Sequence, residues 1–366
     1  MKIAVCHQTF SSGDAIGNDI RGMCRTLSAC GHEPIVLCDH NPHGLNGCPV
    51  VHDFGDSTLS ACDLLIYHHS QDWPRGRDLL HRYRRPVAFR FHNITPARFF
   101  AGYCAEYEET CRRGAELTEL LAHWPQPHLW LSDSEYNQSD LLKAGADPAK
   151  CSVAAPFNHS ERLLCTPNRA NVSGVKARFL FVGRFAPNKG HLHLARFASA
   201  YRQLFGDVFE ITIVGSIDPR LGQYWEEFAS LVRALGIAEH IAVYPHASDQ
   251  AVHELFHQAH AYLTFSEHEG FCVPVVEAQS IGLPVVGSGA TAVRETAGPG
   301  QFLDKPPATP IDYEFYAELA HRAVYDREIR EALVSRGYKN VMSRFSHAAI
   351  ENAFLTPLVP WFRLTL

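Results

Sequence analysis

Several features that would assign a protein to a broad class are missing from this 366-residue sequence. No stretch approaches the ~18–20 consecutive apolar residues that a membrane-spanning helix needs, and the apolar run near the first residue, in MKIAVC, is too short for a signal peptide. The 11 cysteines include no C-x-x-C pair, which favours reduced thiols over a zinc or disulfide framework. The net charge of −6 argues against a general nucleic-acid-binding protein. We expect a cytoplasmic protein, with contact to the inner face of a membrane left open.

The composition, with 46% hydrophobic and 20% charged residues, supports two globular cores. Short apolar runs recur between helix-sized segments, which is typical of parallel sheets covered on both faces. The expected strands form two series, at 2–6, 34–38, 63–68, 86–92 and 128–134, and at 177–183, 209–216, 241–245, 261–266 and 283–288. A polar segment at 165–177, with Pro and Gly, separates the series as a linker. We therefore predict two doubly wound α/β domains, 1–165 and 166–349, with ligands at the carboxyl ends of the strands.

One metal-binding motif occurs, HELFH at 253–257, which matches the H-E-x-x-H pattern of zinc hydrolases. His253 and His257 would lie one helical turn apart, with Glu277 downstream as a third ligand. Chance pairs are expected among 22 histidines, however. The motif also lies in a short helix that leads directly into a strand, whereas a zinc hydrolase needs a longer helix. We disfavour the zinc hydrolase and keep it as the alternative from another class.

Two cations follow the first strand of the second series. The stretch FVGRFAPNKG reads as strand, glycine, Arg184, a proline turn, Lys189 and a glycine before the next helix. A helix N-terminus attracts anions through its unpaired N–H groups and its dipole. Arginine offers a fork that fits phosphate oxygens, and lysine offers a mobile point charge. The segment predicts a diphosphate clamp without a metal, although a surface pair of cations would look the same in isolation.

Two glutamates, eight positions apart, follow a later strand of the same series. In SEHEGFCVPVVEAQ, Glu269 is expected in the loop after the strand, and Glu277 early in the next helix, which Pro274 begins. The backbone amides of Gly270 and Phe271 are expected to point outward from the same loop. Carboxylates accept hydrogen bonds from vicinal hydroxyls, so the pair suits two sugar rings.

Together these segments resemble glycosyltransferase family 4 (glycosyltransferase group 1), the retaining GT-B enzymes. The E-x7-E motif matches in residue type and spacing at Glu269 and Glu277, and the clamp matches at Arg184 and Lys189. The resemblance is close over much of the second expected domain and looser over the first. It implies a GT-B fold of two Rossmann-like domains with an interdomain cleft, the second binding the nucleotide sugar. It also implies that the last helix, about 350–366, packs back on the acceptor-side first domain.

The resemblance extends to the loops of the first domain. PVAFRFHNITP places His92 at the end of a strand, where family members carry a histidine that faces the donor sugar. SSGDAIGNDI is similar to the family's glycine-containing loop near the donor phosphate and acceptor, so Gly13 and Gly17 are assigned close backbone approach. Without the resemblance, these glycines fit an ordinary strand–helix turn equally well. DSEYN resembles the family's strand-to-helix corner, with Ser134 as the expected helix cap.

The implied reaction transfers a hexose of mannose or glucose type from a nucleotide diphosphate sugar, such as GDP-mannose or UDP-glucose, with retention of configuration. The implied acceptor is a glycan or a lipid-linked glycan, and we expect a role in bacterial surface polysaccharide synthesis. Arg184 and Lys189 would stabilise the charge that grows on the departing diphosphate. Glu269 would bind the hexose, Glu277 would bind the ribose, and His92 would contact a donor hydroxyl.

Backbone groups complete the implied site. Amides of Gly270, Phe271 and Cys272 would assist at the sugar and phosphate, and the nucleotide base would lie near Tyr244 and His246. No covalent nucleophile is assigned, so we expect departure and attack on the same face, with a phosphate oxygen accepting the proton.

The sequence departs from the family pattern at two positions of the glutamate loop. Cys272 stands where glycine is common, and its β-carbon is expected to crowd the donor slightly. His268, before the first glutamate, is expected to add a donor-specific contact. The chain contains no D-x-D, so the metal–diphosphate bridge of the other main transferase fold has no candidate. We predict that no metal or other cofactor is needed.

Residues 75–92 contain six arginines in an otherwise acidic protein. One interpretation is a binding site for anionic lipid headgroups or an acceptor diphosphate. The other is a solvated helix face, and the sequence leaves both open. Alternatives that keep the fold are a nucleotide-sugar epimerase, which the E-x7-E motif disfavours, a phosphorylase, and a catalytically silent sugar-nucleotide sensor.

Overall fold

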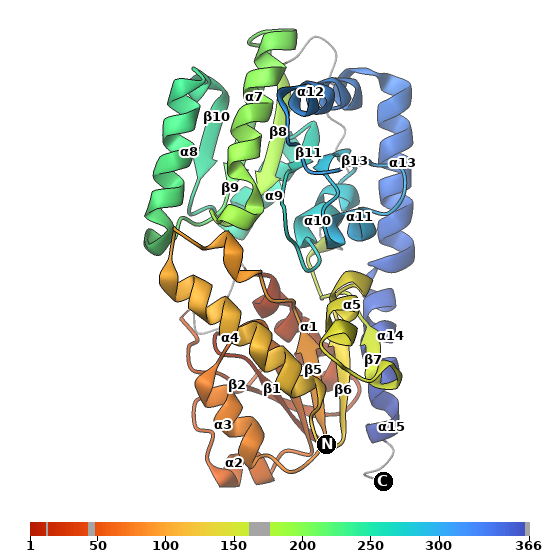
Figure 1. The fold of residues 1–366 in the computed structure, drawn as a ribbon. Coiled ribbons are helices and arrows are strands. Elements are labelled where there is room, and N and C mark those ends of the chain that lie inside the picture. Colours follow the sequence, from red (N-terminus) through yellow and green to blue (C-terminus); the bar gives the residue numbers. More distant parts are fainter. Residues whose placement is uncertain (12–13, 43–47, 161–175, 363–366) are drawn as a thin grey trace. The chain divides into compact units, whose positions relative to one another are not determined.

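The computed structural model describes residues 1–11, 14–42, 48–160 and 176–362, which form two compact units (Figure 1). The first unit comprises residues 1–97, 109–159 and 347–366, and the second comprises 98–108 and 160–346. Gly13 and most of the expected linker at 165–177 lie outside the described residues. Within the described ranges, no helix is long and apolar enough to cross a lipid bilayer.

The first unit is built on a seven-stranded parallel sheet with the order β3-β2-β1-β4-β5-β6-β7. Its strands are β1 (Lys2–Cys6), β2 (Glu33–Leu37), β3 (Val50–Val51), β4 (Leu64–His69), β5 (Val87–Phe91), β6 (His128–Ser132) and β7 (Cys151–Val153). Ala4 of β1 lies between Ile35 of β2 and Leu65 of β4. The strand order reverses at this point, so the loops that follow β1 and β4 diverge, as at the ligand sites of doubly wound sheets.

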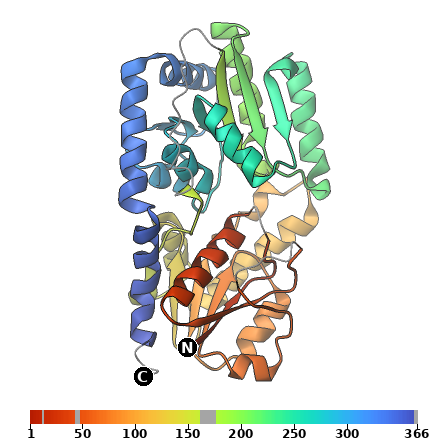
Figure 2. The same ribbon diagram turned by 180° about the vertical axis from the view of Figure 1, so that it is seen from behind.

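Helices cover both faces of this sheet because its strands are apolar on both sides. They are α1 (Ala15–Ala29), α2 (Asp56–Ser60), α3 (Pro74–Arg82), α4 (Ala105–Ala122) and α5 (Glu135–Lys143). One face packs on α3 and α4 through Leu79 and Leu117. The other face packs on α1 through Ile20 and Leu27, and this helix lies in front of the sheet when the unit is seen from behind (Figure 2).

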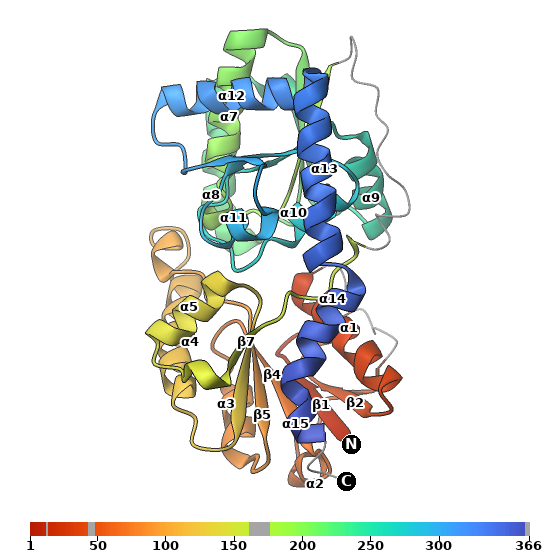
Figure 3. The same ribbon diagram turned by 90° about the vertical axis from the view of Figure 1, so that its right-hand side faces the viewer.

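The end of the chain also packs on the first unit. Helix α14 (His347–Leu355), a short 3₁₀ turn (Thr356–Leu358) and α15 (Val359–Phe362) follow one another there. Ile350, Phe354 and Leu358 are buried in the same core as α1, and Figure 3 shows α14 beside α1. The Thr26 hydroxyl donates a 2.9 Å hydrogen bond to the Glu351 carboxylate across this contact.

The second unit contains a six-stranded parallel sheet with the order β10-β9-β8-β11-β12-β13. Its strands are β8 (Ala177–Val182), β9 (Phe209–Val214), β10 (Ile241–Tyr244), β11 (Ala261–Thr264), β12 (Val285–Ser288) and β13 (Phe302–Asp304). The order reverses between β8 and β11, which places the expected clamp and the expected glutamate loop at the carboxyl ends of neighbouring strands.

Helices again cover both faces of the second sheet (Figure 1). They are α7 (His191–Phe205), α8 (Gly222–Ala234), α9 (Asp249–Gln258), α10 (Val273–Ser280), α11 (Ala292–Ala297), α12 (Pro310–Tyr325) and α13 (Arg327–Arg344). Leu194 of α7, Phe228 of α8 and Tyr316 of α12 share one core. Phe256 of α9 and Val275 of α10 belong to the core on the opposite face.

Residues 98–108 belong to the second unit, although the sequence places them in the first expected domain. The Tyr103 hydroxyl donates to Glu227, and the Tyr107 hydroxyl donates to Asp218, each at 2.6 Å. The guanidinium of Arg220 lies 4.5 Å from the centre of the Tyr107 ring. Two half-buried tyrosines thus hold this segment against the second unit through carboxylate partners. No local pattern in the sequence predicts these pairs.

Candidate functional site

The carboxyl ends of β8 and β11 carry the expected clamp and the first glutamate. Arg184 lies just beyond β8 and is exposed. Lys189 ends the 3₁₀ turn Pro187–Lys189 that leads into α7. Its ammonium donates to both oxygens of the Glu269 carboxylate, at 2.7 and 2.8 Å. The structure therefore joins Lys189 and Glu269, two residues to which the sequence assigned separate parts of one ligand.

The ion pair is partly shielded from water. The side chain of Lys189 is 20% exposed and that of Glu269 is 10% exposed. The Ser266 hydroxyl donates a further 2.8 Å hydrogen bond to Glu269. Such a bidentate, hydrogen-bonded pair holds both charges in fixed positions, so it can present a cation and an oxygen acceptor to one ligand.

Two residues that the sequence did not single out hold this loop. The Asn188 carbonyl accepts from the Glu267 amide at 2.8 Å, and the Asn188 side chain donates to the His268 carbonyl at 3.1 Å. The amide of Glu269 donates to the Thr291 hydroxyl at 2.8 Å. Asn188 and Thr291 are polar residues in loops at the carboxyl ends of strands. This position is the one feature of the sequence from which their role could have been predicted.

Gly190 explains how the loops after β8 and β11 come together. Its φ of 72° is left-handed, and a β-carbon there would lie 2.1 Å from the Phe265 carbonyl oxygen. Only glycine avoids both the strain and the clash. This glycine therefore lets the Lys189 turn approach the end of β11 closely.

Glu277 occupies the fifth position of α10, in its second turn rather than at its start. Burial raises the pKa of its carboxyl to about 7, and the charge of Asp249 adds to the shift. The pKa of the Tyr262 phenol is raised by burial and by the nearby thiol of Cys272, and then by both Glu269 and Glu277. Both carboxylates therefore lie close enough to Tyr262 to act on it, although no contact joins them to each other.

Cys272 precedes α10 in a left-handed conformation with φ 78° and ψ 67°. Glycine is common there because this conformation is strained for a residue with a β-carbon, by about 1–2 kcal/mol. The thiol is buried in the core under α10, and burial raises its pKa. The expected crowding of the donor by the β-carbon is not tested, whereas the backbone strain is directly visible.

This geometry predicts an unusual order of stability for two variants. Cys272→Gly loses the buried thiol but relieves the strain, whereas Cys272→Ala loses the thiol and keeps the strain. We expect the glycine variant to be more stable than the alanine variant by about 1 kcal/mol, the reverse of an ordinary helix position. Urea unfolding of both proteins measures this, and a more stable alanine variant would contradict the strain.

The remaining expected donor contacts are spread around the same sheet end. Phe271 is buried, and its carbonyl accepts from the Thr296 hydroxyl. His268 is buried near the Phe99 ring, with the two ring centres 6.1 Å apart. Gly270 is half-buried in the glutamate loop. Tyr244, the last residue of β10, and His246, two residues later, have exposed side chains. The Tyr244 carbonyl already accepts from the Gly215 amide at 3.2 Å.

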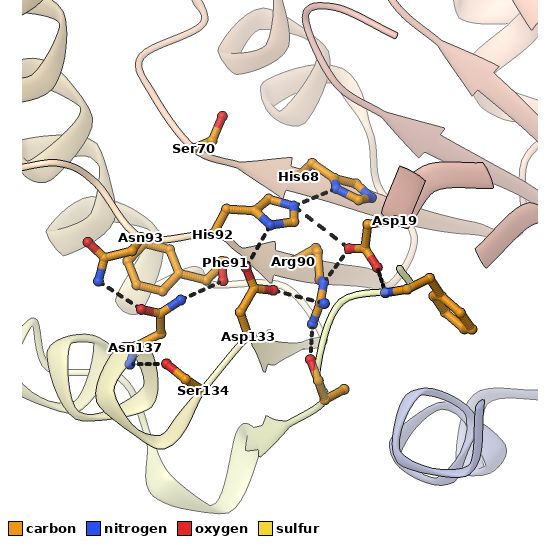
Figure 4. A network of polar contacts seen from close by, with 12 residues as sticks. Asp19, His68, Ser70, Arg90, Phe91, His92, Asn93, Asp133, Ser134 and Asn137 are labelled. Atoms are coloured by element: carbon orange, nitrogen blue, oxygen red, sulfur yellow. Dashed lines mark hydrogen bonds and ion pairs between the residues drawn. The ribbon is translucent and has the colours of Figure 1, made fainter. Parts of the chain in front are cut away.

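His92 belongs to a buried polar network in the first unit (Figure 4). The Arg90 guanidinium pairs with Asp19 of α1 and with Asp133 after β6, each at 2.8 Å. His92 Nδ1 lies 2.9 Å from Asp133, and His92 Nε2 lies 2.7 Å from His68 Nδ1. Strand alternation sends Arg90 to the face that α1 covers, where it meets Asp19.

The network fixes the imidazole of His92 from both sides. As a carboxylate paired with Arg90, Asp133 accepts from His92 Nδ1, which leaves Nε2 to accept from His68 Nδ1. Burial lowers the pKa of His68 well below its usual range, with further lowering by His92. Burial also raises the pKa of Asp19, against the effect of Arg90. Sequence reasoning found His92 and missed the partners that orient it.

The local backbone explains why position 17 is a glycine. A β-carbon there would lie 1.9 Å from the Ser11 carbonyl oxygen, and its amide donates to the Asp14 side chain that caps α1. This is the strand–helix turn that the sequence left as an alternative, and close approach of Gly17 to a ligand stays a prediction. Ser134 caps α5 as predicted, by accepting from the Asn137 amide.

The arginines of 75–92 are largely neutralised. Acidic partners lie within ion-pair distance of five of the six, namely Arg75, Arg77, Arg82, Arg85 and Arg90. The segment therefore has little excess positive charge for an anionic headgroup or an acceptor diphosphate. The observation favours a solvated, ion-paired surface for its exposed members.

Comparison with known proteins finds a family similarity within the second unit. Residues 167–340 match the family described as glycosyl transferases group 1. A Salmonella typhimurium protein assigned to colanic acid biosynthesis as the glycosyltransferase WcaL is 24% identical over 73% of this chain and 62% of its own length. The MMP alpha-(1->4)-mannosyltransferase of Mycolicibacterium hassiacum is 30% identical over 45% of this chain and 38% of its own length. The chain thus spans less than two thirds of the length of these relatives.

Solved structures extend the likeness to the whole fold. The crystal structure of Anabaena HepE in complex with UDP and glucose has a TM-score of 0.79 at 17% identity, covering 98% of this chain and all of that one. WaaG, a glycosyltransferase involved in lipopolysaccharide biosynthesis, has a TM-score of 0.70 at 13% identity, with coverage of 97% and 99%. These matches confirm the predicted GT-B fold of two Rossmann-like parallel sheets. Within the second unit, residues 167–340 are thus similar to the glycosyl transferases group 1 family.

Proposed function

We propose that this protein is a glycosyltransferase that moves a hexose from a nucleotide diphosphate sugar to a hydroxyl of a glycan or lipid-linked acceptor, with retention. The bond between the anomeric carbon and the diphosphate oxygen breaks, and the new bond to the acceptor oxygen forms on the same face. The acceptor proton passes to the diphosphate oxygen. The name of the Mycolicibacterium hassiacum mannosyltransferase supports a mannose-type donor. The name of the Salmonella typhimurium relative supports a role in bacterial polysaccharide synthesis.

The observation that carries this proposal is the Lys189–Glu269 pair at the carboxyl ends of β8 and β11. Its ammonium is held 2.7 Å from a carboxylate that remains partly exposed. Arg184 lies exposed in the same loop, three residues before the 3₁₀ turn. The ammonium of Lys189 and the nearby guanidinium of Arg184 suit a departing diphosphate, and the adjacent carboxylate suits sugar hydroxyls. The proposed clamp consists of side chains, so we expect EDTA to leave the transfer rate unchanged.

The proposed role of His92 carries a condition. Both ring nitrogens already have partners, in Asp133 and His68. For the imidazole to contact a donor hydroxyl, Nε2 must exchange His68 for that hydroxyl. A single neutral hydrogen bond contributes only about 0.5–1.5 kcal/mol, so a bound substrate can supply this exchange.

A thermal-shift screen of UDP, GDP, ADP and dTDP tests the proposal. At a concentration of ~100 Kd, a nucleotide adds about 2.7 kcal/mol to the stability of the protein, or roughly 5–10 °C in Tm. We expect one nucleotide to give such a shift and Arg184→Ala to lose most of it. The same substitution at Arg233, an exposed arginine of α8, should leave the shift intact. No shift with any nucleotide would refute the proposed donor site.

The raised pKa of Glu277 predicts how donor binding depends on pH. The ionised carboxylate of Glu277 accepts hydrogen bonds from two hydroxyls, whereas the protonated form has one oxygen occupied by its own hydrogen. With a pKa of about 7, the ionised form is lost as the pH falls through neutrality. We expect the nucleotide sugar to bind about tenfold more weakly at pH 6 than at pH 8. Titration calorimetry with the nucleotide sugar itself measures this, because its diphosphate diester does not titrate in that range.

Stability without donor should show the opposite trend. Folding raises the pKa of Glu277 from its ordinary value of 4.5 to about 7, so the folded protein favours the protonated side chain. This stabilising contribution is fully present below about pH 4.5 and is lost as the pH rises through about 7. Glu277→Gln should flatten both profiles. A donor affinity that is equally pH-dependent in this variant would assign the effect to another group.

A further inference from the structure

We propose that Asp19, His68 and His92 form a binding site for a divalent transition-metal ion, with Zn²⁺ as the best fit. Each residue offers one donor atom, and the three atoms lie within 4.8 Å of one another. Among the residues that the structure describes, this is the one group of three or more potential ligands close enough to share an ion. Imidazole nitrogens and a carboxylate oxygen are a common donor set for Zn²⁺.

The spacing of the donor atoms suits a small tetrahedral ion. Bonds of about 2.0–2.1 Å place neighbouring ligand atoms of Zn²⁺ roughly 3.3 Å apart. Here His92 Nε2 lies 2.7 Å from His68 Nδ1 and 3.9 Å from Asp19 Oδ2. One distance is shorter and the other longer than the required edge. A shift of the two ring nitrogens by a fraction of an ångström brings both distances toward it. Zn²⁺ would also displace the proton that His68 Nδ1 donates to His92 Nε2, and the neutral His68 ring would then carry its proton on Nε2, which has no hydrogen-bond partner among the described residues.

The surroundings of His92 are those of a metal-bound histidine. Asp133 accepts from His92 Nδ1 at 2.9 Å, which fixes the tautomer that leaves a lone pair on Nε2. A carboxylate behind a ligating imidazole orients the ring and increases its basicity. Asp133 is itself held by Arg90, so the supporting partner is rigid (Figure 4).

The charges of the network leave room for a cation. Two carboxylates, of Asp19 and Asp133, surround one guanidinium, and all three side chains are at most 6% exposed. The group therefore has one more negative than positive charge in a region of low polarity. Arg90 opposes a dication at this site, so we expect an affinity weaker than that of a structural zinc site, with a Kd on the order of micromolar.

The HELFH motif provides the contrast. His253 and His257 lie on one face of α9, with their Nε2 atoms 3.1 Å apart. They are not part of any group of three potential ligands in the described ranges. The sequence motif for zinc thus marks a two-histidine surface, whereas the three-ligand group is assembled from α1, β4 and the end of β5.

Metal binding would inhibit the enzyme, and this part of the inference rests on the proposed function. A metal bond to Nε2 is far harder to exchange for a sugar hydroxyl than the hydrogen bond from His68. Zn²⁺ should therefore slow transfer, and EDTA should restore the full rate. Ion binding can be measured without any activity, so failure of the donor proposal would not be confused with failure of this one.

Calorimetric titration with Zn²⁺ of wild type, His68→Gln and His257→Gln tests the site. We expect one equivalent to bind wild type and His257→Gln alike, and His68→Gln to bind at least about 100-fold more weakly. Thermal unfolding of each variant checks that the fold is kept. Equally weakened Zn²⁺ binding in both variants, or unchanged Zn²⁺ affinity in His68→Gln, would overturn the assignment.

X-ray absorption of the wild-type protein with one equivalent of Zn²⁺ tests the same site without a variant. We expect nitrogen and oxygen neighbours at about 2.0–2.1 Å, with the signature of two imidazoles. Sulfur neighbours at about 2.3 Å would place the ion on cysteines instead and would refute the proposal. Absence of binding in calorimetry at millimolar Zn²⁺ would refute it as well.

Discussion

Replacing Arg184 by alanine is expected to lower kcat for sugar transfer, the step in which the bond between sugar and diphosphate breaks, by about 100- to 1000-fold. A cation beside the departing diphosphate contributes most in the transition state, where negative charge develops on the diphosphate, and the loss of one such group typically lowers the rate by this factor. The side chain of Arg184 is exposed. Its removal therefore leaves no buried charge without a partner, and Tm should change by less than about 2 °C.

Arg233→Ala is the matched control for this experiment. Arg233 is an exposed arginine of the same unit and donates to the Ser230 hydroxyl, at 2.9 Å. It should retain the wild-type rate. Equal rates for the Arg184 variant and wild type would remove the clamp from the account, whereas a large drop in Tm would assign the loss of rate to unfolding.

Arg90→Met is expected to lower the free energy of unfolding by about 3–5 kcal/mol. The substitution keeps the length of the side chain but leaves Asp19 and Asp133 buried without their shared cation. For a unit of this size, the loss corresponds to a decrease in Tm of about 6–20 °C. Differential scanning calorimetry measures it, because unfolding of the first unit should move to lower temperature.

Arg85→Met provides the comparison on the same stretch of sequence. Arg85 pairs with Asp63 at 2.8 Å, but the two side chains are 48% and 30% exposed. An exposed pair contributes at most about 1 kcal/mol, so its loss should be small. Similar changes in Tm for the two variants would show that the buried network does not stabilise the first unit.

Most strands of both sheets could be predicted because each of these is a short apolar run between helical segments. The prediction for 209–216, for example, corresponds to β9 at Phe209–Val214. The short edge strands β3, β7 and β13 were missed, since two or three half-exposed residues carry no pattern of their own. The assignment of 98–108 to the second unit depends on long-range pairs such as Tyr107 with Asp218, which sequence periodicity does not encode.

The candidate donor site was predicted in part. Arg184, Lys189 and Glu269 were found because charged residues after buried strands are unusual and carry a known spacing. The ion pair between Lys189 and Glu269 could not be predicted, because 80 positions separate them and only the parallel order of β8 and β11 brings them together. Thr291 was missed because its role is to accept from a backbone amide, for which no charge or spacing gives a signal.

The network around His92 shows the same limit in the first unit. Asp19, Arg90 and Asp133 come from a helix, a strand and a loop that are far apart in the sequence. Arg90 sits within the apolar run VAFRF of β5. A charged residue in the middle of a buried strand needs partners, and this was the one available sign that a buried acidic pair existed.

The central claim is that the loops after β8 and β11 bind the diphosphate and sugar of the donor. A crystal structure with the nucleotide selected by the thermal-shift screen tests it most directly. The account predicts phosphate oxygens within hydrogen-bonding distance of Arg184 and Lys189, and ribose hydroxyls at Glu277. A nucleotide bound elsewhere in the second unit, with the Lys189–Glu269 pair unchanged and distant from it, would contradict the account.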